Sequence, residues 1–490
     1  MPKPPQFSFE LGTNPSSKQR SRHEPLRILL MTDLGSGCQS RSKTPYATRP
    51  FRQMDIDVFE DFVEEERPAI ELDGTSISIT EMDDFHPDQI VKHVHALQDS
   101  LSLRQQLRTP ATLESAARRV RDLMAPVART GATPTPADET DTETMSRLFG
   151  TDPTTAPSAP AQPQGSVLGQ MIQQAVANHI VPEDDPKAEP YIVAVEAAAT
   201  AHLRGILHDP AFQTVEAAWR GLEMLVSQIE TDETLTLHVW NIGKSELIEA
   251  MGAANEAPDT SVLHKRLVTD RADAPFSLIV TDAHVEGTAE DLRLLGTLGA
   301  IAGRTGALAL APVSPTALGS SSWAALLEAP VTSDTTIAAV RETGLADHIV
   351  GLGPRFLLRQ PYGKRSDPID AFAFEEVDQA AVHLEEFLWG APSLIGTLLI
   401  ARAFSQDGWN ARINQHLHVD DLPSVYYDDA GEQAMLPCAE VLMPDSSVEH
   451  VLSTGITPIV AVKNQNAVQL SYFQTLGHTK GTGQVGPFTA

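Results

Sequence analysis

The clearest helix signal in this 490-residue sequence is the stretch His208-Asp-Pro-Ala-Phe-Gln-Thr-Val-Glu-Ala-Ala-Trp-Arg-Gly-Leu222. Asp209 can accept hydrogen bonds from the free amide groups at the start of a helix, and Pro210 suits the first helical position. Apolar side chains then recur at intervals of three and four residues, which places them on one helix face. This face comprises Phe212, Val215, Trp219 and Leu222. The pattern therefore predicts an amphipathic helix that packs against a core.

Strand and helix patterns alternate after this stretch. Strands are predicted at residues 235–239, 276–282 and 306–311, and helices at residues 244–251 and 290–301. Strands separated by helices are typical of a parallel sheet that is covered by helices. The fold class is therefore predicted to be α/β.

The N-terminal region has its own order of elements. Residues 26–31 read as a largely buried strand that leads into the loop Asp33-Leu-Gly-Ser-Gly37. Alternating apolar residues on both sides of Asp73-Gly74 predict a hairpin over residues 70–79. The segment Met82-Asp-Asp-Phe-His-Pro-Asp88 precedes one long helix, which is expected to run from Pro87 past Leu101. The acidic residues of the segment would stabilise the positive end of the helix dipole.

Composition changes between residues 126 and 165, where proline, threonine, alanine, glutamine and acidic residues dominate. Such a segment buries too little apolar surface to fold, so we expect a disordered linker. A short amphipathic helix is predicted directly after it, with an apolar stripe made of Leu168, Met171, Ile172, Ala175 and Val176. This stripe can dock on its own domain or bind a partner, and the pattern leaves both interpretations open.

Charge and cysteine content limit the classes of partner. The formal net charge is −29, so the chain repels the phosphates of nucleic acids and anionic membranes, and neither is expected as a partner. The two cysteines, Cys38 and Cys438, form neither a disulfide framework nor a metal-binding spacing, which indicates a reducing cytoplasm. No stretch approaches the roughly 20 apolar residues that a membrane-spanning helix needs.

Four motifs follow one another in the second half of the chain. They are Phe212-Gln-x-x-Glu-x-x-Trp-Arg-Gly-Leu222, Pro354-Arg-Phe-Leu-Leu-Arg-Gln-Pro-Tyr-Gly363, Phe372-Ala-Phe-Glu-Glu376 and Leu388-Trp-Gly390. Together they resemble the large subunit of the contractile sheath of type VI secretion systems. The resemblance implies a structural or assembly role for Phe212, Glu216, Trp219, Arg220, Gly221, Leu222, Arg355, Arg359, Pro361, Tyr362, Gly363, Trp389 and Gly390.

The N-terminal region resembles the small subunit of the same sheath. The resemblance lies in the strand that ends in Asp-Leu-Gly-Ser-Gly, the hairpin, and the motif with Asp84, Phe85 and Pro87. The two subunits are usually separate chains in this family, so a fusion is expected here, with the last part of the large subunit shortened. The expected regions are a flexible arm at 1–25, a small-subunit-like domain at 26–125, the linker at 126–165, a large-subunit-like domain at 166–476 and a flexible tail at 477–490.

This resemblance implies a structural protein of the bacterial cytoplasm with the sheath-protein fold, in which mixed sheets carry flanking helices and the small-subunit-like part packs on the large one. Copies would associate into six-fold rings or a helical sheath around an Hcp-like inner tube, attach to a baseplate, and contract to drive the tube outward. The stripe at Leu168 would be gripped by a ClpV-type AAA+ unfoldase. The alternative is a sheath-like accessory, such as a terminator or baseplate adaptor, which the shortened C-terminal part favours.

Arg355 and Arg359 lie four residues apart, so they share one side of a helix or of a strand and form a basic spot in an acidic chain. They can pair with carboxylates of a neighbouring copy, or form internal ion pairs that support the Pro361-Tyr-Gly turn. The sequence leaves these two interpretations open.

No catalytic motif is complete. Gly243-Lys-Ser245 resembles the end of a phosphate-binding loop, but His238 stands where the first glycine of that motif belongs. Two histidine pairs, at 93 and 95 and at 416 and 418, lack carboxylates or cysteines at ligand spacing. An α/β enzyme that uses Asp33 and Asp282 at strand ends remains a third hypothesis. We therefore expect no enzyme activity, no cofactor, no metal and no catalytic residue.

Overall fold

The computed structural model describes residues 24–35, 44–72, 74–124, 188–253, 258–328, 336–378, 383–429, 431–477, 484–485 and 487–489. The predicted linker, the stripe at Leu168 and nearly all of the predicted N-terminal arm lie outside the described residues. The chain divides into two compact units, which are described separately. The first combines residues 1–93 with residues 204–490, and the second comprises residues 94–203.

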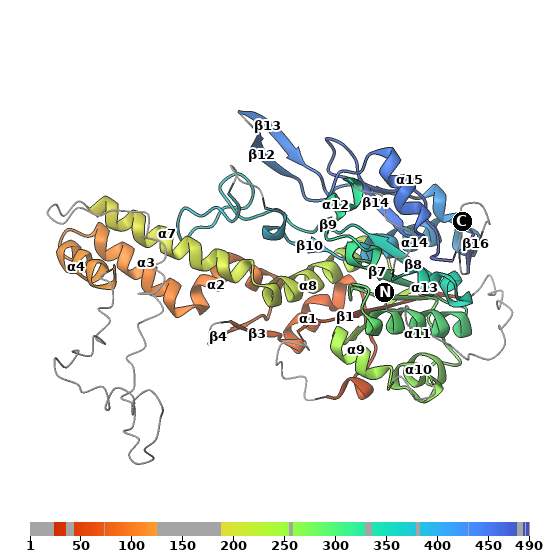
Figure 1. Ribbon diagram of the computed structural model, residues 1–490. Helices are drawn as coiled ribbons and strands as arrows, with labels where there is room; N and C mark the ends of the chain where they lie inside the picture. The colour runs from red at the N-terminus through yellow and green to blue at the C-terminus, as the bar shows by residue number, and fades with distance from the viewer. Residues whose placement is uncertain are drawn as a thin grey trace, which may run out of the picture. The chain divides into compact units, whose positions relative to one another are not determined.

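The first unit is built around a mixed sheet that has nine strands within the described residues, in the order β11-β15-β14-β8-β7-β6-β1-β5-β2 (Figure 1). Six neighbouring strands run parallel to one another. They are β5 (Leu235–Asn241), β1 (Leu26–Thr32), β6 (Leu278–Thr281), β7 (Leu308–Pro312), β8 (Ile349–Gly353) and β14 (Thr457–Ala461). Antiparallel strands complete the two edges: β2 (Arg52–Met54) beyond β5, and β15 (Val468–Leu470) and β11 (His418–Val419) beyond β14.

Strand β1 occupies a central position in this sheet. It pairs with β5 from Leu26 to Thr32 and with β6 from Ile28 to Met31. Six of its seven residues are buried, as expected for a strand that is covered on both faces. A strand from before the predicted linker is thus hydrogen-bonded on both edges to strands from after it. The prediction that the two regions pack into one body is confirmed for this unit.

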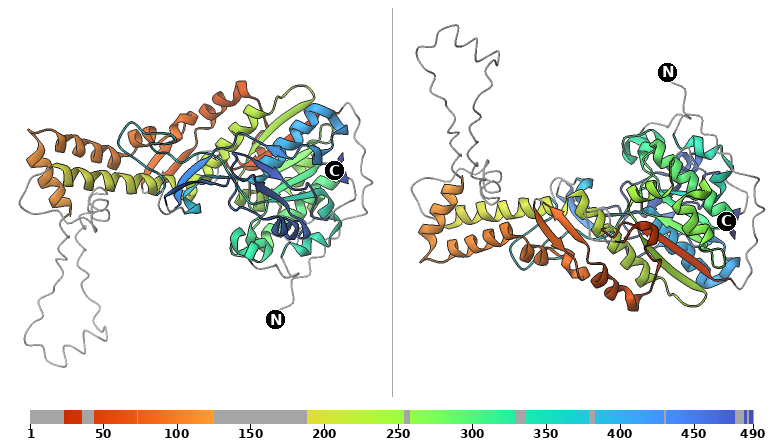
Figure 2. Two further views of the ribbon diagram at one scale, coloured as in Figure 1. Left: turned by 90° about the horizontal axis from the view of Figure 1, so that it is seen from above. Right: turned by 90° about the horizontal axis from the view of Figure 1, so that it is seen from below.

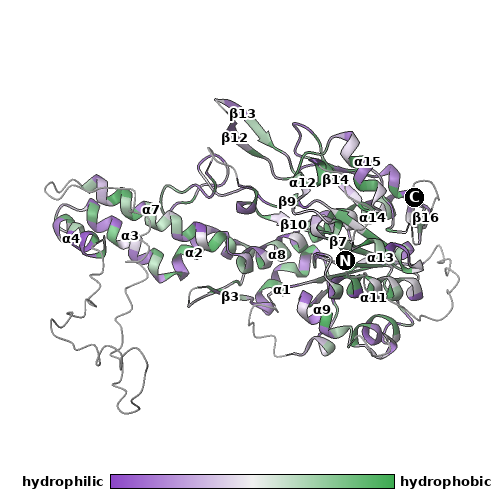
Figure 3. Ribbon diagram, in the orientation of Figure 1, coloured by the Kyte–Doolittle hydropathy of each residue, from purple (hydrophilic) through white to green (hydrophobic). Residues whose placement is uncertain are grey.

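Helices cover both faces of the sheet (Figure 2). Helix α14 (Pro392–Asp407) brings Gly396 against Leu310 and Leu352, whereas α11 (Ala289–Thr305) brings Gly299 against Ile349 on the other face. Helix α8 (Pro210–Gln228) packs beside α14, and α9 (Lys244–Ala250) packs beside α11. Hydrophobic residues accordingly gather on the central strands and on the helix faces that cover them (Figure 3).

Helix α8 begins as the sequence predicts. The Asp209 side chain accepts hydrogen bonds from the amides of Ala211 and Phe212, and Pro210 is the first helical residue. The predicted face of Phe212, Val215, Trp219 and Leu222 is buried. The Trp219 indole donates to the carbonyl of Leu34 and packs against the rings of Phe59 and Phe62. One core residue therefore joins α8 to two N-terminal elements, the segment after β1 and helix α1 (Ile56–Glu66).

The N-terminal elements agree with prediction except in one helix. Strands β3 (Ala69–Leu72) and β4 (Thr75–Ser78) form the predicted hairpin, and Gly74 takes the positive φ that its turn requires. The single helix predicted from Pro87 is wrong, because α2 (Pro87–His93) ends before Val94. Val94 has an extended backbone with its side chain buried, and a new helix begins at His95.

Shorter elements complete the first unit. The helices are α10 (Val262–His264), α12 (Trp323–Glu328), α13 (Ala338–Arg341) and α15 (Asp445–Ser453). The paired strands are β9 (Phe356–Leu357) with β10 (Trp389–Gly390), β12 (Val425–Asp429) with β13 (Glu432–Leu436), and β16 (Gln484–Val485) with β17 (Phe488–Thr489).

The second unit is helical in its described residues. It contains α3 (His95–Arg108), α4 (Leu113–Met124) and α7 (Ala188–Leu207) up to Leu203. Arg104 and Arg108 of α3 both reach Glu196 of α7, at 2.5 and 3.4 Å. This unit, too, joins a helix from before the linker to one from after it. In neither unit do the described residues include a helix long and apolar enough to cross a membrane.

Trp219→Ala is expected to lower the free energy of unfolding by about 3–5 kcal/mol, because the fully buried indole leaves a cavity. Urea denaturation followed by circular dichroism measures the change. Tyr426→Ala is the control, since that residue is 51% exposed and should change stability by less than about 0.5 kcal/mol. A Trp219→Ala variant that keeps the wild-type midpoint would refute the role assigned to this side chain.

Candidate functional site

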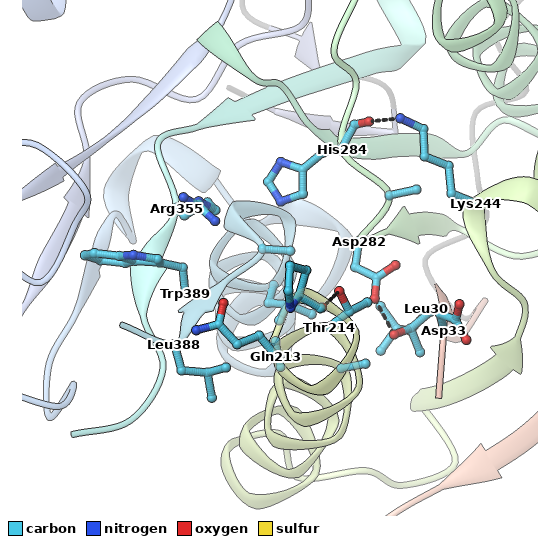
Figure 4. Close-up of a pocket in the computed structure, with 17 residues that line it drawn as sticks. Leu30, Asp33, Gln213, Thr214, Lys244, Asp282, His284, Arg355, Leu388 and Trp389 are labelled. Atoms are coloured by element: carbon cyan, nitrogen blue, oxygen red, sulfur yellow. Dashed lines mark hydrogen bonds between the residues drawn. The ribbon is translucent and has the colours of Figure 1, made fainter. Parts of the chain in front are cut away.

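A cavity lies where ligands usually bind in sheets of this type. The strands that follow β1 along the chain are placed on both of its sides, with β5 on one edge and β6, β7 and β8 on the other. Open α/β sheets bind ligands outside the carboxyl ends of the strands at such a switch point. Here a cavity of about 370 Å³ is lined by Thr32 at the end of β1, by Asp33 directly after it, and by Asp282 and His284 after β6 (Figure 4).

The carboxyl group of Asp282 has an unusual environment. It accepts a short hydrogen bond from the hydroxyl of Thr32. Burial raises its pKa to about 7, the nearby Asp33 charge acts in the same direction, and the Thr32 bond opposes both. The neighbouring His284 imidazole is affected in the opposite sense, because burial, followed by the charges of Arg355 and Lys244, lowers its pKa to about 3. At neutral pH the imidazole is therefore uncharged.

The two cations of this cavity already have partners. The Lys244 amine lies 2.8 Å from Asp291 and donates to the carbonyl of His284 at 2.7 Å. Arg355 forms a short ion pair with Glu440, and both line a second cavity of about 550 Å³. His284 lines the second cavity as well, so the two are neighbours along the sheet edge.

The hydroxyl of Thr32 donates to Asp282, and the hydroxyl of Thr214 donates to the Pro210 carbonyl. A carboxyl group with a pKa of about 7 can act as a general base, so the Thr32–Asp282 pair is the part of this cavity on which an enzyme hypothesis would rest. The part of the chain that the structure describes contains no group of three or more histidine, cysteine, aspartate or glutamate side chains placed to hold a metal.

A buried ion network lies beside α8. The Arg359 guanidinium donates to Glu216 at 2.7 and 3.3 Å and to Glu376 at 2.7 and 2.9 Å. All three side chains are at most 8% exposed. Burial alone would raise the pKa of Glu376, but the Arg359 charge and the hydrogen bonds from His208, Arg359 and the Tyr362 amide together outweigh it and lower that pKa to about 2. Both carboxylates of this cluster, which we call the Arg359 network, are thus paired by one planar cation.

Two further side chains close the Arg359 network. Arg220 donates to Glu216 at 2.8 Å and to the Tyr362 hydroxyl at 3.0 Å. The Arg359 guanidinium lies over the Tyr362 ring, 4.3 Å from its centre, and the Tyr362 amide donates to Glu376 at 2.7 Å. Burial, together with the Glu216 charge, raises the pKa of Tyr362 to about 12, so its hydroxyl stays protonated.

The N-terminal region contacts this network through the segment at residues 84–88. The edge of the His86 ring packs on Tyr362, with 5.1 Å between ring centres. Asp88 accepts hydrogen bonds from the amides of Asp370 and Ala371 at 2.9 and 3.1 Å. Phe85 packs edge-on against Phe212. The segment therefore contacts residues of the first two of the four motifs and the backbone just before the third.

Comparison with known families matches both halves of the chain. Residues 189–476 match the VipB family, described as the EvpB tail sheath N-terminal domain, and this match covers more than half of the chain. The chain belongs to the VipB tail sheath family. Residues 3–129 match the VipA family of the type VI secretion system, so one chain carries both sheath components.

A curated relative agrees with this membership. The chain is 31% identical over 293 residues to the type VI secretion system sheath protein TssC1 of Pseudomonas aeruginosa. The aligned region covers 56% of this chain and 58% of that protein, so the chain spans little more than half of the length of this relative.

The structure brings together most of the sheath-motif residues predicted from the sequence. Glu216, Arg220, Arg359 and Tyr362 meet in the Arg359 network, and Phe212, Trp219 and Leu222 are core residues. Glycines at 221 and 390 allow close packing, because an added Cβ would lie 2.6 Å from Leu394 or Phe356. The other motif positions lie elsewhere. Asp84 accepts a hydrogen bond from the Thr80 amide and so caps its own turn, and Pro87 begins α2. Trp389 lines the first cavity, and Pro361 and Gly363 lie in the turn beside Tyr362.

Arg355 and Arg359 do not form the shared basic spot that their spacing predicts. Arg359 is buried between two internal carboxylates, whereas Arg355 is partly exposed and pairs with Glu440. Of the two interpretations left open by the sheath motif, internal pairing is the one seen for Arg359. The strand β9 between them is only two residues long, so the backbone does not keep both side chains on one side.

Sequence reasoning missed a second link between the two sheath components. Arg49 donates to both oxygens of Glu246, at 2.8 and 2.7 Å, and also to the Asn241 carbonyl. Arg266 donates to the carbonyls of Ala47 and Arg49. No local signal identifies these pairs, since their members lie about two hundred residues apart in the sequence.

Arg359→Met is expected to lower the free energy of unfolding by about 3–5 kcal/mol, because it leaves the buried Glu376 carboxylate without its arginine and Glu216 with Arg220 alone. Chemical denaturation of the purified variant measures this change. The matched control is Arg365→Met, which removes the same charge from an exposed position and should cost less than about 0.5 kcal/mol. Equal effects of the two substitutions would contradict the importance of the Arg359 network.

Asp282 is expected to make stability fall as pH rises from about 4 to 7. Its pKa is near 3.9 in the unfolded chain and about 7 in the folded chain, so the folded state binds the extra proton in this window. Relative to Asp282→Asn, the wild-type protein should lose roughly 2–4 kcal/mol across the window and nothing more above it. Thermal and urea unfolding at pH 4, 5.5, 7 and 8 test this, and parallel pH curves for the two proteins would refute it.

Proposed function

We propose that this chain is a structural subunit of the contractile sheath of a bacterial type VI-like secretion machine. Copies polymerise around an inner tube, and contraction of the polymer propels that tube. The observation that carries the proposal is the position of β1, which lies in the VipA-matched region and pairs on both edges with strands of the VipB-matched region. A single chain thereby contains both components of a sheath building block.

The way in which the halves are joined suits a mechanical role. A load that pulled the halves apart would have to break the hydrogen bonds along both edges of β1, the Arg49–Glu246 pair and the contacts of residues 84–88. Because these contacts are spread over the unit, they share the load. In this proposal each copy moves as a body, and the energy of contraction resides in the contacts between copies.

The proposed partners follow from the same assignment. They are further copies of the chain, an Hcp-like inner-tube protein, a baseplate and a ClpV-type AAA+ unfoldase that recycles contracted sheath. The predicted stripe of Leu168, Met171, Ile172, Ala175 and Val176 is the proposed site of the unfoldase, and it lies outside the described residues. The chain would work in the bacterial cytoplasm as a non-enzymatic component, with nucleotide hydrolysis left to the unfoldase.

Negative-stain electron microscopy of the purified chain, alone and with the inner-tube protein, tests the proposal. Long hollow rods of uniform diameter are the expected result, because head-to-tail contacts between identical subunits close into rings or extend into helices. Discrete rings or monomers in both samples would contradict a sheath and indicate the alternative, a terminator or baseplate adaptor.

A further inference from the structure

Two arginine side chains and a histidine lie at one end of the sheet, and neither arginine forms an ion pair within the described residues. Arg27 of β1 and His238 of β5 point to the same face as Leu29 and Trp240, which pack under α9 and α11. The Arg271 guanidinium stacks on the Phe276 ring at 4.4 Å, and the His238 ring meets the same ring edge-on, with 5.5 Å between ring centres. Burial, followed by the charges of Arg271 and Arg27, lowers the pKa of His238 to about 4, so this ring is uncharged at neutral pH. We call Arg27 and Arg271 the basic patch.

Nothing in the described part of the chain neutralises the basic patch. Neither Arg27 nor Arg271 forms an ion pair there, although acidic residues outnumber basic ones by 65 to 36 in the sequence. The Nε atom of Arg271 is buried and has no hydrogen-bond partner. Burial lowers the pKa of Arg271 and the charges of Arg27 and Arg266 add to this effect, with no carboxylate acting against it. Like charges this close cost free energy unless an anion lies between or over them.

A complementary acidic surface lies on the other face of the sheet. It consists of Glu60 on α1, Asp83 on the short 3₁₀ helix η2 (Met82–Phe85), and Glu223 on α8, which packs beside α14. Burial raises the pKa of Glu223, Arg220 lowers it, and Asp83 and Glu60 raise it further, so both other carboxylates of this acidic patch repel the Glu223 charge. Two exposed apolar side chains of α1, Ile56 and Val58, are 57% and 39% accessible.

We propose that the basic patch of one copy binds the acidic patch of a second copy in the sheath, an inference that rests on the proposed function. The two patches differ in composition and lie on opposite faces of the sheet, so the contact is heterologous and can repeat indefinitely. Charge complementarity selects this occupant: one patch is basic and the other carries a net negative charge, since its three carboxylates outnumber the nearby Arg220. The acidic patch also has apolar side chains beside it that a partner would cover.

Charge reversal on each surface tests the contact. Variant one is Arg27→Glu with Arg271→Glu, and variant two is Glu60→Lys with Asp83→Lys. Each variant alone should lower the sedimentable, rod-forming fraction roughly tenfold or more, because it places like charges opposite each other. An equal mixture should recover assembly. The intact basic patch of variant two can bind the intact acidic patch of variant one, and the two reversed patches also carry opposite charges. Sedimentation and electron microscopy measure the assembled fraction of each variant and of the mixture, with the wild-type chain as the reference.

A matched control separates the patch from general charge effects. Arg118→Glu with Arg119→Glu makes the same change in net charge at exposed positions of α4, and it should assemble as the wild-type chain does. The proposal is overturned if variant one still assembles like the wild type, if the mixture assembles no better than its parts, or if the control is equally defective.

Folding of the variants is checked by their melting temperatures. If a reversal variant melts well below the wild type, Arg27→Gln with Arg271→Gln replaces it, because glutamine removes the charge and keeps a polar side chain. That variant must also lose assembly for the proposal to stand. A wild-type chain that forms no rods under any condition would contradict the proposed sheath function, whereas rods that survive every patch variant would contradict only the contact proposed here.

Discussion

The hydrogen bonds that β1 makes on both of its edges hold the first unit together. Without β1, the facing edges of β5 and β6 would present a row of unpaired amides and carbonyls inside a sheet that is covered on both faces, and unpaired buried backbone groups are costly. The remaining contacts between the halves depend on this placement. Trp219 reaches the Leu34 carbonyl just beyond the end of β1, and Arg49 reaches Glu246 just beyond the end of β5. The two sheath components are therefore parts of one core rather than two domains in contact.

The charged groups of this core hold helices and loops in position rather than carry out a reaction. The Arg359 network holds α8 against two loops that follow it in the chain. An ion pair as deeply buried as this one contributes more to the orientation of these elements than to the stability of the fold. At the cavity beside Asp282, the carboxylates and cations are satisfied by one another and by the backbone within the described residues. A sheet edge that binds ligands in many α/β proteins thus carries internal contacts here, in keeping with membership of a sheath family.

The features that sequence analysis predicted correctly depend on local patterns. Asp209 and Pro210 mark the start of α8, the spacing of Phe212 to Leu222 gives its buried face, and Asp73-Gly74 gives a hairpin, all from residues within a few positions of each other. The position of β1 could not be predicted, because its partners in β5 and β6 lie more than two hundred residues away. Arg359 was identified only through its motif, since nothing local pairs it with Glu216. The break at Val94 has no proline or glycine to signal it.

The central place of the earliest strand has a consequence for biosynthesis. Leu26 leaves the ribosome well before Leu235, its partner in β5, and longer still before Leu278, which pairs with Ile28. At bacterial rates of roughly 5–20 residues per second, β1 waits on the order of 10–50 s for its second neighbour. Both edges of this apolar strand stay open until β5 has been made, and one edge stays open until β6 follows, so the strand is exposed to other nascent chains. A chain of this design would depend on chaperones that shield its first hundred residues until the ribosome has completed β6.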